Sequence, residues 1–311
     1  MAISASMVKE LREATGAGMM DCKKALTETD GDMDKAVEYL REKGLAKAAK
    51  KANRIAAEGL VATCLSEDGK VASIVEVNSE TDFVAKNDTF KAYVNSVAKQ
   101  AADTNAADIE AFLAEPWALD TSKTVKEELA SQIAVIGENM NIRRFEKLTT
   151  DGIIVSYIHA GGKIGVLVEA DTDSNSDAVK ECLKNVAMQV AALNPKFTSS
   201  DEVDQDYIKH EEEILLAQIK NDPKEASKPE NVILGMIKGR IKKELKEIVL
   251  LEQVYVKAED GKQSVKDYVA SVAKAEGIKL NIKKFVRFET GEGLEKKEEN
   301  FAEEVAKQMG M

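Results

Sequence analysis

The chain of 311 residues contains an internal repeat, and this repeat constrains its fold more than any other feature. In each copy a Gly-containing turn separates two β-rich runs, as expected of a β-hairpin. Asp68-Gly69 supplies the first turn and Gly161-Gly162 the second. The runs are residues 59–63 and 74–77 in the first copy, and 152–156 and 167–170 in the second.

A helical pattern and a third β-rich run follow each hairpin. The helical apolar positions match one for one and lie at the spacing of a single buried face. Each copy then closes on Asn-Ile-basic-basic-Phe, at 141–145 and 281–285, which alternates like a strand. We therefore expect two small three-stranded antiparallel sheets, each packed on helices. The matched helical positions are Phe90, Tyr93, Val94, Val97, Ala98 and Ala101 against Val179, Cys182, Leu183, Val186, Ala187 and Val190.

The connection between hairpin and helix differs between the copies. It is about four residues longer in the first copy, where residues 78–87 include Phe83 and Val84, whereas residues 171–176 of the second copy are wholly polar. A connection of this kind is expected to be a loop on the surface. Two interpretations remain open: another molecule receives the ring of Phe83, or Phe83 folds back over its own helix.

Three short amphipathic helices are predicted before the repeat. Ser4 is suited to cap the first, Asp30-Gly31 turns the chain into the third, and Gly44 is expected to end the third. A separate Ala- and Lys-rich linker helix should follow at 47–54. Met19 and Met20 cannot both face one small core from a tight turn, so we expect at least one to be exposed, although both could tuck under the bundle.

The second copy carries an insertion of about fifty residues after Phe197. Two helical apolar stripes flank a Pro-containing turn, which predicts an antiparallel coiled-coil arm. Such an arm would either mediate self-association or hold a distant part of a partner. One last amphipathic helix is predicted after Gly291-Glu292-Gly293.

Composition and charge narrow the classes of function. A formal charge of −11 disfavours phosphate-driven nucleic-acid binding, and no apolar stretch is long enough to span a membrane. The start of the chain resembles neither a signal peptide nor a transit peptide, so we expect a cytoplasmic protein. Cys22, Cys64 and Cys182 are scattered and are interpreted as reduced core thiols, with no metal site.

Residues that could carry catalysis are scarce. The two histidines, His159 and His210, have no nucleophile in a recognisable setting. Residues 161–165 lack the spacing of a phosphate-binding loop and lie between two strands. We therefore expect neither an enzyme nor a bound cofactor. His159 should be exposed at a strand end, either as a partner contact or as an ordinary surface residue.

Two segments, residues 15–26 and 81–87, closely resemble signatures of the bacterial elongation factor Ts family. Residues 136–139, 141–144, 159–168 and 291–294 are also similar to the family pattern. The resemblance implies a guanine-nucleotide exchange factor for the GTPase elongation factor Tu. It implies that Thr81, Asp82, Phe83 and Val84 form a loop that displaces the partner's Mg²⁺, and that further contacts come from Arg12, Met19, Met20, Ile136, Gly137 and His159.

The expected fold is α+β, and four regions are predicted. Residues 1–55 would form a ubiquitin-associated-like (UBA-like) three-helix bundle with its linker helix. Residues 56–148 and 149–288 would form the two core subdomains, with the coiled-coil dimerisation arm at about 200–251, and residues 289–311 a C-terminal helical module. Two other functions compete with this one: a general adaptor that binds other proteins, and an enzyme whose active site the sequence does not reveal. Stimulated release of GDP from elongation factor Tu would distinguish an exchange factor from both.

Overall fold

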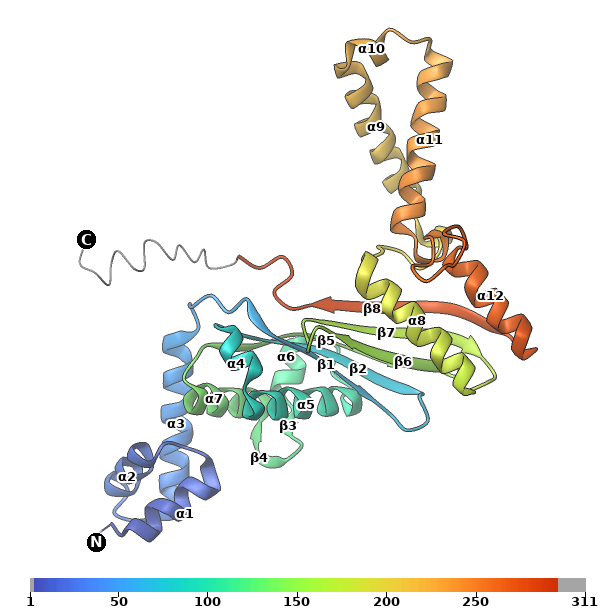
Figure 1. The fold of residues 1–311 in the computed structure, drawn as a ribbon. Helices are drawn as coiled ribbons and strands as arrows, with labels where there is room; N and C mark the ends of the chain where they lie inside the picture. The colour runs from blue at the N-terminus through green and yellow to red at the C-terminus, as the bar shows by residue number, and fades with distance from the viewer. Residues whose placement is uncertain (1–2, 296–311) are drawn as a thin grey trace.

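The computed structural model describes residues 3–295 and shows two small sheets stacked face to face between layers of helices (Figure 1). The N-terminal helices lie at one end of this core, and a long helical hairpin projects from the other. The fold is α+β, as the sequence predicted.

The two sheets have the same topology, in which the hairpin is followed by a third strand beside its second strand. All pairings are antiparallel, and each sheet has a register shift at the same place, between Glu76 and Val77 and between Glu169 and Ala170. The predicted pair of three-stranded sheets is thus confirmed. The first sheet contains β1 (Glu58–Leu65), β2 (Val71–Ser79) and β5 (Met140–Thr149); the second contains β6 (Ile153–His159), β7 (Ile164–Thr172) and β8 (Leu280–Glu289).

Helices cover the outer face of each sheet because their apolar stripes are buried there. In the first copy these are α5 (Asp88–Asp103), α6 (Ile109–Ala114) and α7 (Val125–Ile136), with a hairpin of β3 (Pro116–Trp117) and β4 (Asp120–Thr124) before α7. In the second copy they are α8 (Asp177–Leu193) and α12 (Val265–Glu276). All twelve matched apolar positions of α5 and α8 are buried, as predicted.

The inner faces of the two sheets form a third, shared core. This core consists of apolar side chains from both subdomains, and its burial contributes roughly 25 cal/mol per Å² of apolar area. The buried members are Val61, Ala72, Ile74 and Leu148 from the first sheet and Ile154, Leu167, Val286 and Phe288 from the second.

The N-terminal bundle consists of α1 (Ala5–Thr15), α2 (Met19–Glu28) and α3 (Met33–Lys51). Ser4 caps α1, as predicted, by accepting a hydrogen bond from the Met7 N–H. The prediction that Gly44 ends the third helix is wrong, because α3 continues through it to Lys51. Gly44 is buried against α7, and this contact offsets the roughly 1 kcal/mol that a mid-helix glycine costs.

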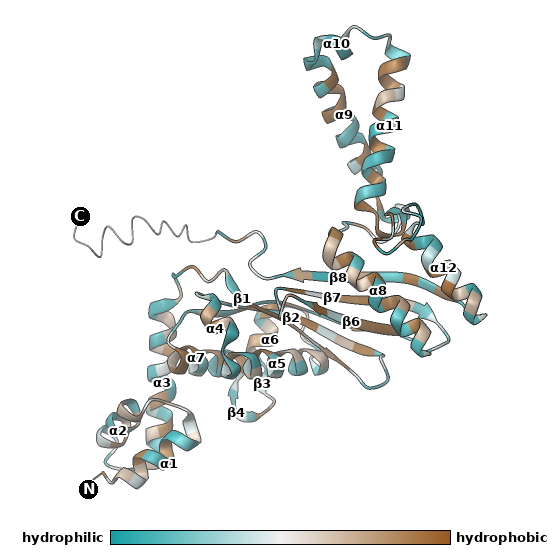
Figure 2. Cartoon of the chain, in the orientation of Figure 1, coloured by the Kyte–Doolittle hydropathy of each residue, from teal (hydrophilic) through white to brown (hydrophobic). Residues whose placement is uncertain are grey.

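The insertion in the second copy forms the predicted helical hairpin. Apolar residues on its facing sides make a separate small cluster around Ile219, Ile237 and Ile241. Figure 2 shows hydrophobic colouring concentrated on the sheets, whereas the hairpin alternates between hydrophilic and hydrophobic positions. Its elements are η1 (Ser200–Glu202), α9 (Gln205–Asn221), α10 (Pro223–Ala226) and α11 (Glu230–Ile248), and η2 (Leu250–Glu252) returns the chain to the core.

Within residues 3–295, no helix combines the length and the apolar character needed to cross a membrane. The amphipathic helix predicted for the end of the chain lies outside the described residues.

Candidate functional site

The segment predicted as the functional loop is a short helix, α4 (Asp82–Lys86), so the expectation of an irregular loop is wrong. Thr81 caps it, because its Oγ1 accepts a hydrogen bond of 3.4 Å from the Val84 N–H. Asn87 ends α4 and caps α5, accepting from the backbone N–H groups of Thr89 and Phe90. The four extra residues of the first copy therefore build one capped turn of helix.

The helix α4 is packed on one side and presents an aromatic ring on the other. Ala85 is buried and Val84 packs against the first core, whereas Phe83 is 79% exposed. The alternative in which Phe83 folds back over its own helix is therefore excluded. An aromatic ring this exposed contributes little burial energy to its own chain and is accessible to another molecule.

Two charged side chains close to Phe83, Asp82 and Lys86, belong to its own helix. Lys86 Nζ lies 2.6 Å from the Asp82 carboxylate and 5.8 Å from the centre of the Phe83 ring. The hydrogen bond from Lys86 lowers the pKa of Asp82, and the charges of Lys86 and Lys163 lower it further. Asp82 therefore stays ionised well below neutral pH and presents a fixed negative charge beside the ring.

A set of crossed hydrogen bonds fixes the start of α4 to the segment after α7. The Glu138 carboxylate accepts from the Thr81 N–H at 3.0 Å and from Thr81 Oγ1 at 2.7 Å. In the reverse direction, Glu80 accepts from the Asn139 N–H at 2.5 Å. We call these four residues (Glu80, Thr81, Glu138 and Asn139) the clasp.

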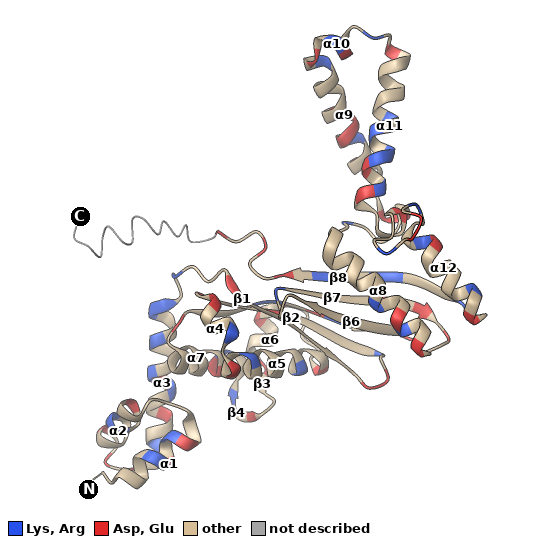
Figure 3. Cartoon of the chain, viewed as in Figure 1, with Lys and Arg blue, Asp and Glu red and all other residues tan. Residues whose placement is uncertain are grey.

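The end of α3 joins the same assembly. The Asn139 side chain donates to the Arg54 carbonyl at 2.8 Å, Arg54 forms an ion pair with Glu80 at 3.4 Å, and Lys51 donates to the Gly137 carbonyl. The N-terminal helices are thus connected to α4 through α3, a helix roughly 28 Å long. Figure 3 shows several basic positions along this connecting helix.

Ile136 and Gly137 lie at the end of α7, directly before Glu138. Ile136 is half-buried and packs against the first core, whereas Gly137 is exposed. Gly137 has a φ of +92° and caps the helix by donating to the Ile133 carbonyl. The clasp brings these two residues next to α4.

His159 ends β6 and is exposed, as predicted. Its Nδ1 lies 3.0 Å from the Tyr157 hydroxyl. The following turn reaches the first copy, because Val61 N–H donates to the Gly162 carbonyl and Lys163 pairs with Glu58. Glu58 begins β1, and α4 packs against β1, so this turn lies near α4.

Arg12, Met19 and Met20 lie in the N-terminal bundle, at the outer end of α3 and apart from α4 (Figure 1). Met19 is 58% exposed and Met20 is 74% exposed, so the alternative in which both are tucked under the bundle is excluded. Arg12 is also exposed. All three side chains are therefore accessible at this end of the molecule.

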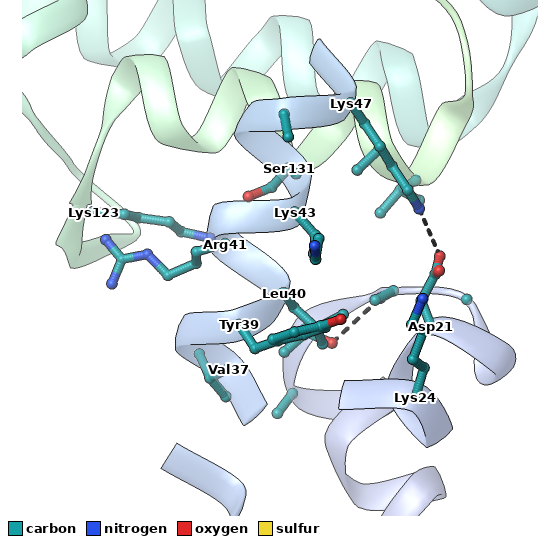
Figure 4. A pocket seen from close by; sticks show the side chains of 18 of the residues that line it. Asp21, Lys24, Val37, Tyr39, Leu40, Arg41, Lys43, Lys47, Lys123 and Ser131 are labelled. Carbon is teal, nitrogen blue, oxygen red and sulfur yellow. Dashed lines mark hydrogen bonds and ion pairs between the residues drawn. The ribbon is translucent and has the colours of Figure 1, made fainter. Parts of the chain in front are cut away.

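A cavity of about 330 Å³ lies where the bundle meets the first core (Figure 4). Lys47 and Asp21 point toward each other across it and form an ion pair at 2.8 Å. On the other side of α3, Arg41 pairs with Glu127 at 3.2 Å. The first pair holds α2 against α3, and the second holds α3 against α7 of the core. Together they fix where the exposed methionines of α2 lie.

Of the four clasp residues, only Thr81 was predicted from the sequence as a site residue, and Glu80, Glu138 and Asn139 were missed. Glu80 and Glu138 are single carboxylates in short connections, where no periodicity marks them, and they lie 58 positions apart in the chain. The one available signal was that Glu138 lies within the family-like stretch 136–139. Among residues 3–295, no group of three or more His, Cys, Asp or Glu side chains is arranged to hold a metal ion.

A rigid duplicated scaffold that presents an exposed aromatic residue and an exposed methionine pair is typical of a protein that binds another protein. The comparisons with known proteins give the family. Residues 80–292 match the family model described as elongation factor TS. Proteins named elongation factor Ts from Clostridioides difficile (strain 630) and Clostridium novyi (strain NT) are 57% and 56% identical, each over 99% of both chains. This chain belongs to the elongation factor Ts family, whose members are factors of translation elongation.

Proposed function

We propose that this protein is a guanine-nucleotide exchange factor for the GTPase elongation factor Tu. It binds the GDP complex of the GTPase, promotes the release of GDP and so allows GTP to bind. The observation that carries the proposal is the 79% exposure of Phe83 on a helix whose backbone is held in place at both ends. Membership of the elongation factor Ts family supports the identity of the partner.

Exchange of this kind needs no chemical step. A factor that binds the nucleotide-free GTPase more tightly than the GDP-bound form weakens GDP binding by the same ratio, because coupling between two ligands is reciprocal. The protein therefore acts by binding and not as an enzyme that makes or breaks bonds. Its surface needs only to be more complementary to the nucleotide-free state than to the GDP-bound state.

Phe83 is the residue we propose to act as a wedge. Its ring enters the partner beside the Mg²⁺ site, displaces the groups that hold the metal and removes the cation that neutralises the β-phosphate of GDP. Asp82 supports this step because its negative charge lies on the same turn of helix. Thr81 and Val84 set the position of that turn, through the cap and through packing on the first core.

The remaining predicted contact residues act at other surfaces of the partner. Arg12, Met19 and Met20 bind from the N-terminal bundle, and Ile136, Gly137 and His159 bind on the side of α4. Exposure of both methionines and of His159 supports this assignment, as does the position of Gly137 directly before Glu138 of the clasp.

The four predicted regions divide the work. The GTPase is embraced by the UBA-like bundle of residues 1–55, which includes the whole of α3, and by the two core subdomains, 56–148 and 149–288. A C-terminal module at 289–311 completes the set. The inserted hairpin acts as a coiled-coil arm for self-association. Exposed apolar residues on the hairpin support the last assignment: Ile214, Val232 and Leu234.

Stopped-flow release of a fluorescent GDP analogue from purified elongation factor Tu tests the proposal. We expect the wild-type protein to accelerate release and Phe83→Ala to lower the rate at least about tenfold, a change of ~1.4 kcal/mol. Leu119→Ala is the matched control, because Leu119 is also an exposed apolar residue (72%) but lies on the hairpin between β3 and β4. If the wild type left GDP release unchanged, the proposed function would be wrong; equal rates for Phe83→Ala and wild type would exclude only the wedge.

A further inference from the structure

Both carboxylate oxygens of Glu138 are used to hold one residue, Thr81. Oε2 accepts from the Thr81 N–H and Oε1 from its hydroxyl, at 3.0 and 2.7 Å. The same hydroxyl oxygen accepts from the Val84 N–H and so caps α4. Hydrogen bonds to a charged acceptor are roughly twice as strong as neutral ones. Glu138 therefore fixes both the backbone and the side chain of the residue that begins α4.

The helix α4 depends on this support because it is only five residues long. A single turn of helix is unstable in isolation, and most of its stability must come from its caps and its packing. The exposed ring of Phe83 cannot contribute packing within this chain. The direction in which Phe83 points is therefore set by the backbone of α4, and that backbone is set by Ala85, by Val84 and by Thr81 in the clasp.

We infer that Glu138 is a positioning residue for nucleotide exchange, which acts by holding Phe83 in the orientation that enters the partner. This inference rests on the proposed function. A side chain held in its bound orientation before contact loses less conformational entropy on binding than a free one. Glu138 stays within this chain and acts through Thr81 and α4.

The segment at the end of α3 also contacts the clasp. Glu80 is held by Arg54, and Asn139 donates to the Arg54 carbonyl, so the clasp is tied to the segment that follows α3. The helix α2, which carries Met19 and Met20, packs against α3. Phe83 on α4 and the exposed methionines on α2 thereby stay at a fixed separation. A partner that engages the methionines first would find Phe83 already in place.

The test combines exchange kinetics with a double-mutant cycle. We expect Glu138→Ala to lower the maximal rate of GDP release at saturating factor by about tenfold, equivalent to ~1.4 kcal/mol. Because Glu138 acts through Phe83, the same substitution in a Phe83→Ala background should change the rate by less than about twofold. A tenfold loss in both backgrounds would overturn the inference, because it would mean that Glu138 acts elsewhere.

Substitutions at Thr81 provide the rescue. Thr81→Val removes the hydroxyl and should lower the rate as Glu138→Ala does, whereas Thr81→Ser keeps both hydrogen bonds of the hydroxyl and should recover most of the rate lost in Thr81→Val. Glu110→Gln is the charge-matched control, since Glu110 is exposed on α6 and should leave the rate unchanged. Equal rates for Thr81→Val and Thr81→Ser would contradict the inference.

A measurement without the partner separates this inference from the proposed function. Hydrogen–deuterium exchange of peptides covering residues 80–90 should be at least about tenfold faster in Glu138→Ala than in wild type, with the midpoint of urea unfolding little changed. Unaltered exchange of this segment would show that Glu138 does not hold α4. Absence of GDP release by the wild type would instead count against the proposed function and leave this result standing.

Discussion

The two copies of the core are joined by a reciprocal pair of backbone hydrogen bonds, in which the first strand of each copy donates to the hairpin turn of the other. Val61 of β1 donates to the Gly162 carbonyl in the second hairpin turn, at 2.7 Å. Ile154 of β6, the matching residue, donates to the Gly69 carbonyl in the first turn, at 2.8 Å. The two sheets are therefore related by an approximate internal twofold symmetry. The connections between each hairpin and its helix do not follow this symmetry. Within each copy, a matched bond of 2.9 Å also continues the pairing of the second and third strands: Thr150 N–H donates to the Lys70 carbonyl, and Thr290 N–H donates to the Lys163 carbonyl.

The copies differ most where the hairpin passes to its helix. Eight residues (80–87) separate β2 from α5, but only four (173–176) separate β7 from α8. The longer connection contains α4 and half of the clasp. The second connection is polar and caps its helix with Ser176 alone. The shared scaffold supplies stability, and the site is built where one copy departs from the other.

A second difference concerns an equivalent glutamate on the inner face of each sheet. Glu76 is fully buried and accepts from Arg143, Arg144, Asn78 and the Gly291 N–H. In the second copy the matching Glu169 has a single ion pair, with Lys283 at 2.7 Å. The first copy thus anchors the segment after β8 as well as its own strands.

Grafting the second connection into the first copy should have the largest effect. Replacing residues 80–87 with the sequence of residues 173–176 removes α4 and Glu80 but supplies Ser176 as a cap for α5. We expect GDP release from elongation factor Tu to slow at least about 100-fold, equivalent to ~2.7 kcal/mol, because the proposed wedge is absent. Stopped-flow fluorescence measures the rate.

The graft is informative only if the scaffold still folds. Far-ultraviolet circular dichroism and the urea midpoint should stay close to wild type, because the graft reproduces a connection that already works in the second copy. A folded graft that still releases GDP at the wild-type rate would show that the difference between the copies has no functional role.

Replacing each of the two buried glutamates in turn should lower the free energy of unfolding by different amounts in the two copies. Glu76→Ala leaves Arg143 and Arg144 without their buried acceptor, and we expect a loss of about 3 kcal/mol in the free energy of unfolding. Glu169→Ala removes one bond to a lysine whose side chain is 60% exposed, so a loss of about 1 kcal/mol is expected. Urea unfolding of both variants measures the difference, and equal losses would contradict it.

The repeated parts of the molecule were predictable from the sequence. Alternation and helical periodicity report burial directly, so both sheets, the faces of α5 and α8 and the helical hairpin after Phe197 were predicted correctly. The length difference between the connections also located Phe83. These features depend on contacts within one element or between neighbouring elements, which a sequence pattern records.

Features that depend on distant contacts were not predictable. Gly44 reads as a helix end, but α3 continues because α7, some ninety positions later, packs against it. The segment 81–87 reads as a loop, but Thr81 and Asn87 turn it into a capped helix. Glu138 holds Thr81 across 57 positions of sequence, and no periodic pattern marks such a pair. Side-chain hydrogen bonds between connections are therefore the part of the site that only coordinates reveal.

The smallest expected effect concerns two matched positions on the covering helices, Tyr93 of α5 and Cys182 of α8. Both are buried, and burial raises the pKa of Tyr93 well above its usual range and that of Cys182 to about 11. At pH 8 such a thiol is roughly 0.1% thiolate, and the thiolate is the reactive form. We expect Cys182 to resist a thiol reagent in the native protein, whereas the partly exposed Cys64 reacts.

Counting modified thiols by mass spectrometry tests this, with Cys64→Ser as the control variant. In that variant native modification at pH 8 should be nearly absent, because Cys22 is also buried, and both remaining thiols should react once urea unfolds the chain. Rapid modification of Cys182 in the folded protein would contradict the prediction, because it would mean that α8 separates from its sheet while the rest of the chain stays folded.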